Sequence, residues 1–256
     1  MANYVEVKNN NGTVTIDDTH PRMVKTRTIT LATGYTELDE AYRWGIRGYV
    51  SNDYLLAAYS TFDISLNSNE KFVAIRAKRQ RTNVAVFGGF VSSNKYHISL
   101  LSSVTNKNTY AGDFLVDIYG TVPSSGGTSS GLEVFNSSGT KIFDSDYYTM
   151  DVVGTYSVVN KEIEEFTSAK TSYSMGGHSI DNRAVVINSC INKIYRHPKE
   201  WGTPWASMLY GVVFGSTIHL EMRLLNGWLI GQGGGITPHG LSYACSGIIL
   251  NTKNIT

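Results

Sequence analysis

The sequence predicts an all-β protein made of two tandem β-sandwich or jelly-roll-like domains, each opened by a β-hairpin. Composition is the first observation, because 16 Tyr and 9 Phe, together with many Val, Ile and Thr, favour strands over helices. The second is the absence of any long amphipathic helical pattern, while 25 Gly supply tight turns between short strands. The third is a strand–turn–strand motif that occurs twice and divides the chain into two halves.

The repeated motif spans residues 5–18 and 132–145, an offset of 127 residues. Without a gap, six identical residues align: Glu6 with Glu133, Val7 with Val134, Asn9 with Asn136, Gly12 with Gly139, Thr13 with Thr140 and Asp17 with Asp144. The turn that ends at Gly139 suits local backbone hydrogen bonding and a positive φ, as a tight hairpin requires. We therefore expect each half to begin with a hairpin.

Further short strands follow each hairpin at near-regular spacing, which is typical of a sandwich or flattened barrel. In the third and fourth of these, at 71–77 and 83–87, we expect a hairpin around the charged segment 78–81. The expected strands of the first half are 23–31, 49–62, 71–77, 83–87, 95–101 and 113–119, and those of the second half are 147–159, 183–195, 212–214, 218–225, 228–230 and 243–250. Core candidates in the second half are Val185, Ile187, Ile191 and Ile194.

A linker separates the two halves. Residues 123–131 read Pro-Ser-Ser-Gly-Gly-Thr-Ser-Ser-Gly and contain no side chain that could anchor a core. The second copy of the motif begins directly after them. The expected organisation is an N-terminal β domain over 1–122 for docking and assembly, a linker over 123–130, and a C-terminal β domain over 131–256 that faces outward.

Charge and cysteine content limit the classes of partner. The formal net charge is +1, so we expect no bulk attraction to nucleic acid or to an anionic membrane. No secretory signal is visible at the N-terminus, and no apolar run is long enough to insert into a membrane. Cys190 and Cys245 are expected to be free buried thiols, although a disulfide remains open if their strands are neighbours.

Catalytic and cofactor motifs are weak throughout the chain. The glycine run 231–235 lacks the Lys-Ser/Thr of a phosphate loop, and the six histidines show no metal-ligand spacing. Paired carboxylates such as Asp144 and Asp146, or Glu162 and Glu165, could serve glycoside cleavage. Because Asp17 repeats Asp144, that position is better explained as part of the hairpin. We expect no enzymatic activity, no cofactor and no metal.

A basic segment covers Arg76, Lys78, Arg79 and Arg81. A nucleic-acid site would need aromatic platforms and basic surroundings, and neither accompanies this segment. We therefore expect a solvated turn or a salt-bridging contact with another subunit.

Recognition is best sought in the least regular stretch, 196–210, and in the loop 231–240. Both are expected to be loops in which large rings lie beside charged groups, and such rings can stack on sugars or anchor a protein contact. The alternative is that the rings plug one end of the sandwich. The candidate recognition residues are Arg196, His197, Trp201, Trp205, Tyr210 and His239.

The second motif also carries a family resemblance. Residues 131–145, followed by Tyr147-Tyr148 and by Val152-Val153-Gly154, resemble the opening Gly-Leu-x-Val-Phe-Asn-x-x-Gly…Phe-Asp-Ser of small tailed-phage virion proteins of the tail tip or tail fibre. The first copy departs from this pattern, since Lys8 replaces the aromatic residue. The resemblance implies a structural protein without enzymatic activity, assembled in the host cytoplasm into the virion tail.

That resemblance also implies partners. Other tail proteins and further copies of the chain, in a trimer or hexamer, are expected, with a host surface glycan or protein as a possible target. Two other functions stay open. One is a carbohydrate-binding receptor-recognition module, and the other is a polysaccharide depolymerase.

Overall fold

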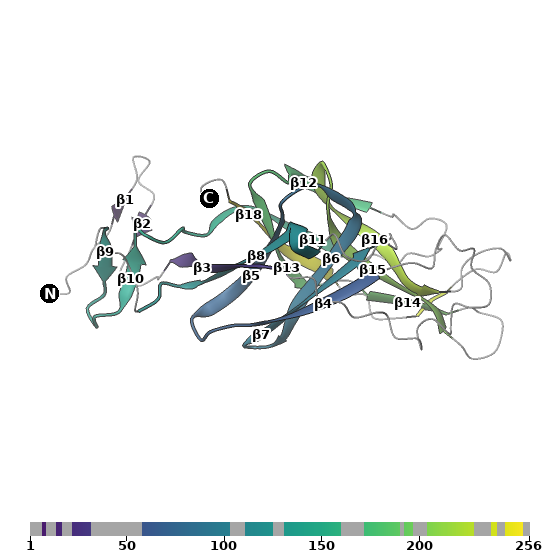
Figure 1. Ribbon diagram of the computed structural model, residues 1–256, viewed down its shortest axis with the longest axis horizontal. Helices are drawn as coiled ribbons and strands as arrows, with labels where there is room; N and C mark the ends of the chain where they lie inside the picture. The colour runs from purple at the N-terminus through teal and green to yellow at the C-terminus, as the bar shows by residue number, and fades with distance from the viewer. Residues whose placement is uncertain are drawn as a thin grey trace.

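The computed structural model describes residues 7–8, 14–16, 22–31, 58–102, 111–124, 131–159, 172–189, 192–196, 204–227, 237–239 and 244–252. These residues form an all-β protein, as predicted, whose only described helical turn is η2 (Ala111–Asp113). Two large antiparallel sheets and two small hairpins account for the strands. Figure 1 shows them along one long axis, with the hairpins at one end.

The first large sheet has six strands. Their order is β11 (Asp151–Val159), β18 (Ala244–Asn251), β13 (Arg183–Ser189), β5 (Glu70–Ala77), β8 (Phe114–Thr121) and β3 (Met23–Thr30). The second has eight strands, with the path β12 (Ser172–Ser179), β16 (Thr217–Gly227), β15 (Pro204–Phe214), β6 (Arg81–Ser92), β7 (Lys95–Ser102) and β4 (Ala58–Ser65). In addition, β14 (Asn192–Arg196) pairs with β15 and with β17 (Thr237–His239).

The main hydrophobic core lies between these two sheets. Along β8, alternate residues Phe114, Val116 and Ile118 point into it, as the sequence alternation predicts. From the opposite sheet come buried side chains such as Val86, Ile98 and Leu220, and the rings of Phe114 and Phe214 meet edge to face at 5.9 Å between centroids. Such a pair adds about 1 kcal/mol beyond its buried area. Two inward-facing sheets that share one core make a β-sandwich.

The expected division into two tandem sandwiches is not confirmed. Each large sheet takes strands from both halves of the sequence. In the six-stranded sheet, β13 of the second half pairs with β5 of the first through Val185 with Ile75 and Val186 with Ala74. In the eight-stranded sheet, β15 pairs with β6 through Val212 with Val86. Residues on both sides of the Ser/Gly linker therefore complete one core.

The expected hairpin of 71–77 and 83–87 is wrong. β5 lies in the six-stranded sheet, whereas β6 lies in the eight-stranded sheet and pairs with β7 and β15. The chain thus crosses from one sheet to the other at 78–80. Asp113 fixes this crossing, because its carboxylate accepts hydrogen bonds from Arg79, at 2.9 Å, and from Arg81, while its carbonyl accepts one from the Lys78 amide.

The six-stranded sheet curves until its two edges approach each other. The edge strand β3 pairs with residues 148–150 through Lys25 N to Tyr148 O at 2.7 Å and Met150 N to Met23 O at 2.8 Å. A bridge between Val24 and Thr149 lies between these bonds. The chain then runs directly into β11 at the opposite edge. A second, smaller core of Ala74, Tyr119, Ala184, Val186 and Leu250 fills the concave face.

The two predicted hairpins are both present, and they have the same register. The first is formed by β1 (Val7–Lys8) and β2 (Val14–Ile16), and the second by β9 (Glu133–Phe135) and β10 (Lys141–Asp144). Val7 pairs with Ile16 as Val134 pairs with Phe143, and Lys8 pairs with Val14 as Phe135 pairs with Lys141. Gly139 has the expected positive φ, at 76°. The sequence repeat is therefore also a structural repeat.

Candidate assembly and recognition surfaces

The second hairpin is held by an ion cluster. Lys141 Nζ contacts a carboxylate oxygen of Glu133 and lies 3.0 Å from that of Asp144. Both Lys141 and Asp144 are buried, and Asp144 also accepts a hydrogen bond from the Asp146 amide at 3.0 Å. Burial raises the pKa of the Asp144 carboxyl, but the bonds from Asp146 and Lys141 outweigh it, so the pKa lies below its usual range. Asp144 is thus part of the hairpin, in agreement with its repetition as Asp17.

Apolar side chains are exposed near this hairpin. Among the described residues, five of the six large hydrophobic side chains that are exposed fall within 132–153: Leu132, Phe135, Tyr148, Val152 and Val153. Leu132 and Phe135 are 58% and 50% exposed. The strand β9 is exposed, while β10 is largely buried. This concentration marks the hairpin end as a candidate contact surface.

The candidate recognition residues fall in another part of the molecule, around β14, β15 and β17. Arg196 is the last residue of β14, opposite Pro204 of β15 on one side and Thr237 of β17 on the other. His239 of β17 lies opposite Ile194, two residues from Arg196. In Figure 1, β14 lies at the end of the long axis opposite the two hairpins. The docking and recognition elements expected from the sequence are therefore at opposite ends.

The expectation of a loop over all of 196–210 is wrong for its second part. Trp205 and Tyr210 lie within β15, and His239 lies within β17. Between the pairs Tyr195–Ala206 and Arg196–Pro204 the register shifts, so Trp205 is the extra residue of a β-bulge. A bulge turns a side chain away from the regular alternation and is common next to functional sites.

The backbone brings some of these residues together and not others. Arg196, Trp205 and His239 lie within a few residue positions of one another. Tyr210 lies opposite Met222, five residues further along β15, at a distance of about 17 Å along the strand from Trp205. His197, Trp201 and the glycine run 231–235 lie outside the described residues, as do Cys190 and Ile191.

The basic segment contacts acidic residues of the same chain. Arg76 Nε donates to Asp117 at 2.6 Å, and Asp117 also accepts from Thr28 at 2.6 Å. Arg79 and Arg81 both donate to Asp113. A pairing with another subunit is therefore not needed to explain these three arginines. The two aspartates are far along the sequence from 76–81, which is why no local pattern indicated them.

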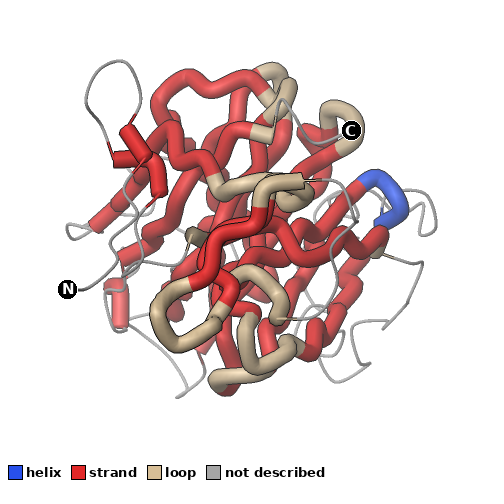
Figure 2. Tube along the Cα trace, turned by 90° about the vertical axis from the view of Figure 1, so that its left-hand side faces the viewer, coloured by secondary structure: helices blue, strands red, loops and turns tan. Residues whose placement is uncertain are grey.

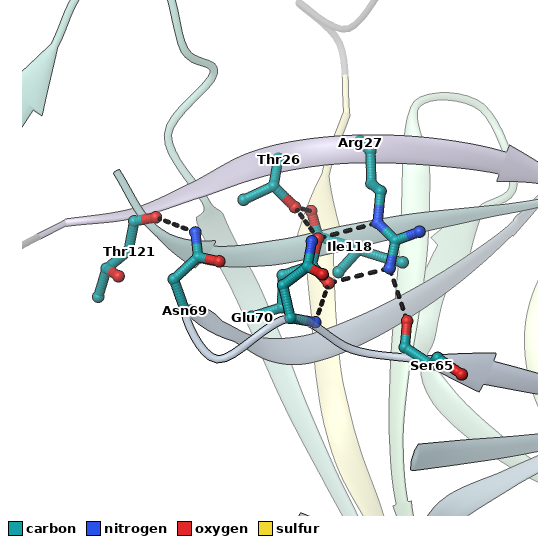
Figure 3. A network of polar contacts seen from close by, with 8 residues as sticks. Thr26, Arg27, Ser65, Asn69, Glu70, Ile118 and Thr121 are labelled. Carbon is teal, nitrogen blue, oxygen red and sulfur yellow. Dashed lines mark hydrogen bonds and ion pairs between the residues drawn. The ribbon is translucent and has the colours of Figure 1, made fainter. Parts of the chain in front are cut away.

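A second buried carboxylate joins the edge strand β3 to the turn before β5 (Figure 3). Glu70 is 2% exposed and accepts hydrogen bonds from Arg27 Nε, the Asn67 amide and Thr26 Oγ1. Burial raises the pKa of Glu70, but these donors outweigh it, and the pKa lies below the usual value. Arg27 also donates to the Ser65 carbonyl at 2.6 Å, so it connects β3 with the end of β4. The network stiffens the sandwich near its hairpin end.

Two carboxylate–histidine pairs lie on the eight-stranded sheet. His97 Nδ1 is 2.8 Å from Asp63, which also contacts Lys95 at 2.7 Å, and His219 Nε2 is 3.5 Å from Glu221. In the part of the chain that the structure describes, no three His, Cys, Asp or Glu side chains gather as a metal site would require. No described helix is long and apolar enough to cross a membrane.

A comparison of the chain with protein-family models, with curated proteins and with solved structures finds no match.

Proposed function

We propose that this chain is a structural protein of a phage virion, in the tail tip or tail fibre, where it mediates assembly and attachment to the host surface. The observation that carries the proposal is the duplicated hairpin, whose two copies share sequence and register and lie at one end of a single sandwich. An element built twice at one end suits contact with neighbouring subunits. The resemblance of 131–145 to small tailed-phage virion proteins supports the same assignment.

The arrangement of the sandwich fits this role. A single core with strands from both halves makes a rigid body between the hairpin end and the β14–β17 end. A rigid spacer with one surface for assembly and another for recognition is what a tail component requires. Other tail proteins are the expected partners, and a closed homo-oligomer, a trimer or hexamer, is the expected state in the virion tail.

Particle composition tests this proposal. An epitope tag placed after Thr256 should appear in purified phage particles from the host that carries this sequence, and immunogold should label the tail. Recovery of the tagged chain only in the soluble lysate, with particles free of it, would exclude a virion protein. A capsid protein of the same particle serves as the positive control for labelling.

A second candidate function is recognition of a host glycan through the β14–β17 end. The specific observation in its favour is the bulge at Trp205, next to Arg196 and close to His239. Replacing Trp205 by Ala should reduce adsorption to host cells at least tenfold while particles still assemble. The matched control is Phe90→Ala, which removes another exposed aromatic side chain from the same sheet, in β6. Equal adsorption of both variants would reject this role for Trp205.

A further inference from the structure

The outer edge of β9 has backbone groups directed away from its own hairpin. Leu132 uses both of its backbone groups toward residue 145, donating to Ser145 Oγ at 2.8 Å and accepting from the Ser145 amide at 2.9 Å. The Asn136 amide likewise points inward, to the Thr140 carbonyl at 2.9 Å. Since backbone groups alternate along a strand, those of Glu133 and Phe135 point outward. Among the described strands, only β10 pairs with β9.

The first hairpin shows what a protected version of this edge contains. At the position of Phe135 it has Lys8, and at the position of Lys141 it has Val14. A lysine on an edge strand is a common device against pairing with another chain. In the second hairpin the lysine is on the inner strand, where it contacts Glu133 and Asp144, and the edge strand carries an exposed phenylalanine instead. Of two copies of one element, the second therefore lacks the protection.

We propose that β9 is a self-association edge, and that it pairs antiparallel with β9 of a second copy of this chain across a twofold axis at Val134. In that register Glu133 lies opposite the partner's Phe135, and their outward amides and carbonyls form four hydrogen bonds in all. Val134 faces its own symmetry mate as the central pair without hydrogen bonds. The result is one four-stranded sheet made of two hairpins.

Side chains favour this register over its neighbours. On one face of the joined sheet, Leu132 and Val134 of the two copies form a continuous apolar row. On the other face, Phe135 covers the side chain of Glu133, whose charge Lys141 already neutralises. A register centred on Glu133 would instead place two carboxylates opposite each other, which is destabilising. A net charge of +1 for the whole chain adds little repulsion between copies.

The occupant is a second copy because the contact is self-complementary. A twofold contact uses the same surface on both partners, and β9 meets that condition when Val134 lies on the axis. The contact concerns only the chain itself and does not depend on the proposed function. Combined with threefold symmetry, it would give six subunits.

A cysteine at the axis tests the register. Val134→Cys, in a background with Cys190→Ser and Cys245→Ser, should give a disulfide-linked dimer in high yield under mild oxidation, because Cα atoms of such a pair lie about 4.5 Å apart. Glu133→Cys in the same background is the matched control. Its symmetry mate is displaced by two residues, roughly 8 Å away, which is too far for a disulfide. Monomer for Val134→Cys, or equal linkage for both variants, would overturn the proposal.

The edge itself is tested by copying the first hairpin. In sedimentation velocity the unmodified chain should dimerise at micromolar concentration, and Phe135→Lys should weaken the dimer at least tenfold with an unchanged circular dichroism spectrum. Ser137→Lys, in the exposed turn, adds the same charge away from the edge and should leave the dimer intact. Undiminished dimerisation of folded Phe135→Lys, or a strictly monomeric unmodified chain, would contradict the inference. If Phe135→Lys does not fold, the cysteine pair decides.

Discussion

Phe135 lies directly opposite Lys141 across the second hairpin, at the register position where Lys8 lies opposite Val14 in the first. Residues directly opposite in an antiparallel ladder point to the same face of the sheet. The lysine has therefore changed strand between the two copies without changing face. In both hairpins, that face also carries the repeated Glu and Asp, which are Glu6 and Asp17 in the first copy and Glu133 and Asp144 in the second.

This exchange predicts that the lysine can be moved in the second hairpin. Lys141→Val should loosen residues 132–146, because the buried Asp144 loses the ammonium that lies 3.0 Å away. Phe135→Lys combined with Lys141→Val recreates the arrangement of the first hairpin and should restore the order. Amide hydrogen exchange of the Asp146 N–H, which is bonded to Asp144, reports on both variants. Equal exchange in the single and double variants would show that Lys at 135 does not reach the carboxylates.

Arg76 is predicted to matter more for stability than its partly exposed position indicates. Asp117 has no exposed surface, and Arg76 and Thr28 are its hydrogen-bond donors. Arg76→Met leaves a buried carboxylate without its cation and should cost about 3 kcal/mol or more in urea unfolding. The double change with Asp117→Leu removes the uncompensated charge and should recover most of that loss. An additive double variant would show that the pair is not coupled.

Stability should fall in acid because several carboxylates have lowered pKa values. Burial raises the pKa of Asp113, but the hydrogen bonds from Arg79 and Arg81 outweigh it, and Glu70 and Asp144 behave alike. A carboxyl whose folded pKa is below its unfolded value stabilises the fold at neutral pH, and this contribution disappears as the pH falls from about 4 through the folded pKa. Urea unfolding at a series of pH values should therefore show a steep loss below about pH 4.

Glu70→Gln isolates one of these groups. It should cost about 1.5–3 kcal/mol at pH 7, where charged hydrogen bonds to Arg27 and Thr26 are lost. At pH 2 the difference from the unmodified chain should nearly vanish, since Glu70 is then protonated in both the folded and the unfolded state. A difference that stays constant across the pH range would assign the effect to packing instead.

Gly247 is predicted to tolerate no side chain. A Cβ there would lie 2.0 Å from the Val186 carbonyl oxygen and 2.5 Å from Tyr156 Oη, and a backbone oxygen in a sheet cannot move aside easily. Gly247→Ala should lower stability by about 3 kcal/mol, at the upper end of the overpacking range. Gly89→Ala is the control, since its Cβ would meet nothing within 4 Å. Similar melting temperatures for the two variants would contradict the packing around β18.

Local patterns in the sequence predicted local structure well. The turn residues before Gly139 predicted the second hairpin, and the alternation of Phe114, Val116 and Ile118 predicted which face of β8 enters the core. Both features depend on neighbours within a few residues. The repeat of 127 residues even carried over to the register, because identical side chains and turns fix the same pairs.

Sheet membership could not be predicted in this way. The strands β5 and β6 are separated by three residues, yet they belong to different sheets, since their partners β8 and β7 come later in the chain. The charged segment between them was assigned to a turn, but its partner Asp113 is more than 30 residues away. For the recognition residues, the bulge at Trp205 depends on pairing with β14, which no periodicity within 204–210 indicates.

The shared core predicts that neither half of the chain folds alone. A fragment of residues 1–122 would lack β13 and β15, leaving the partner edges of β5 and β6 unpaired. A fragment of 131–256 would lack the same contacts from the other side, together with the pairing of 148–150 with β3. Each fragment should therefore be insoluble or unfolded by circular dichroism, and co-expression of the two should give a soluble complex. Two fragments that fold independently, with cooperative thermal transitions of their own, would restore the two-domain organisation. The full chain cut by a protease within 123–130 is the matched control, and it should keep both pieces associated because the core between the sheets holds them.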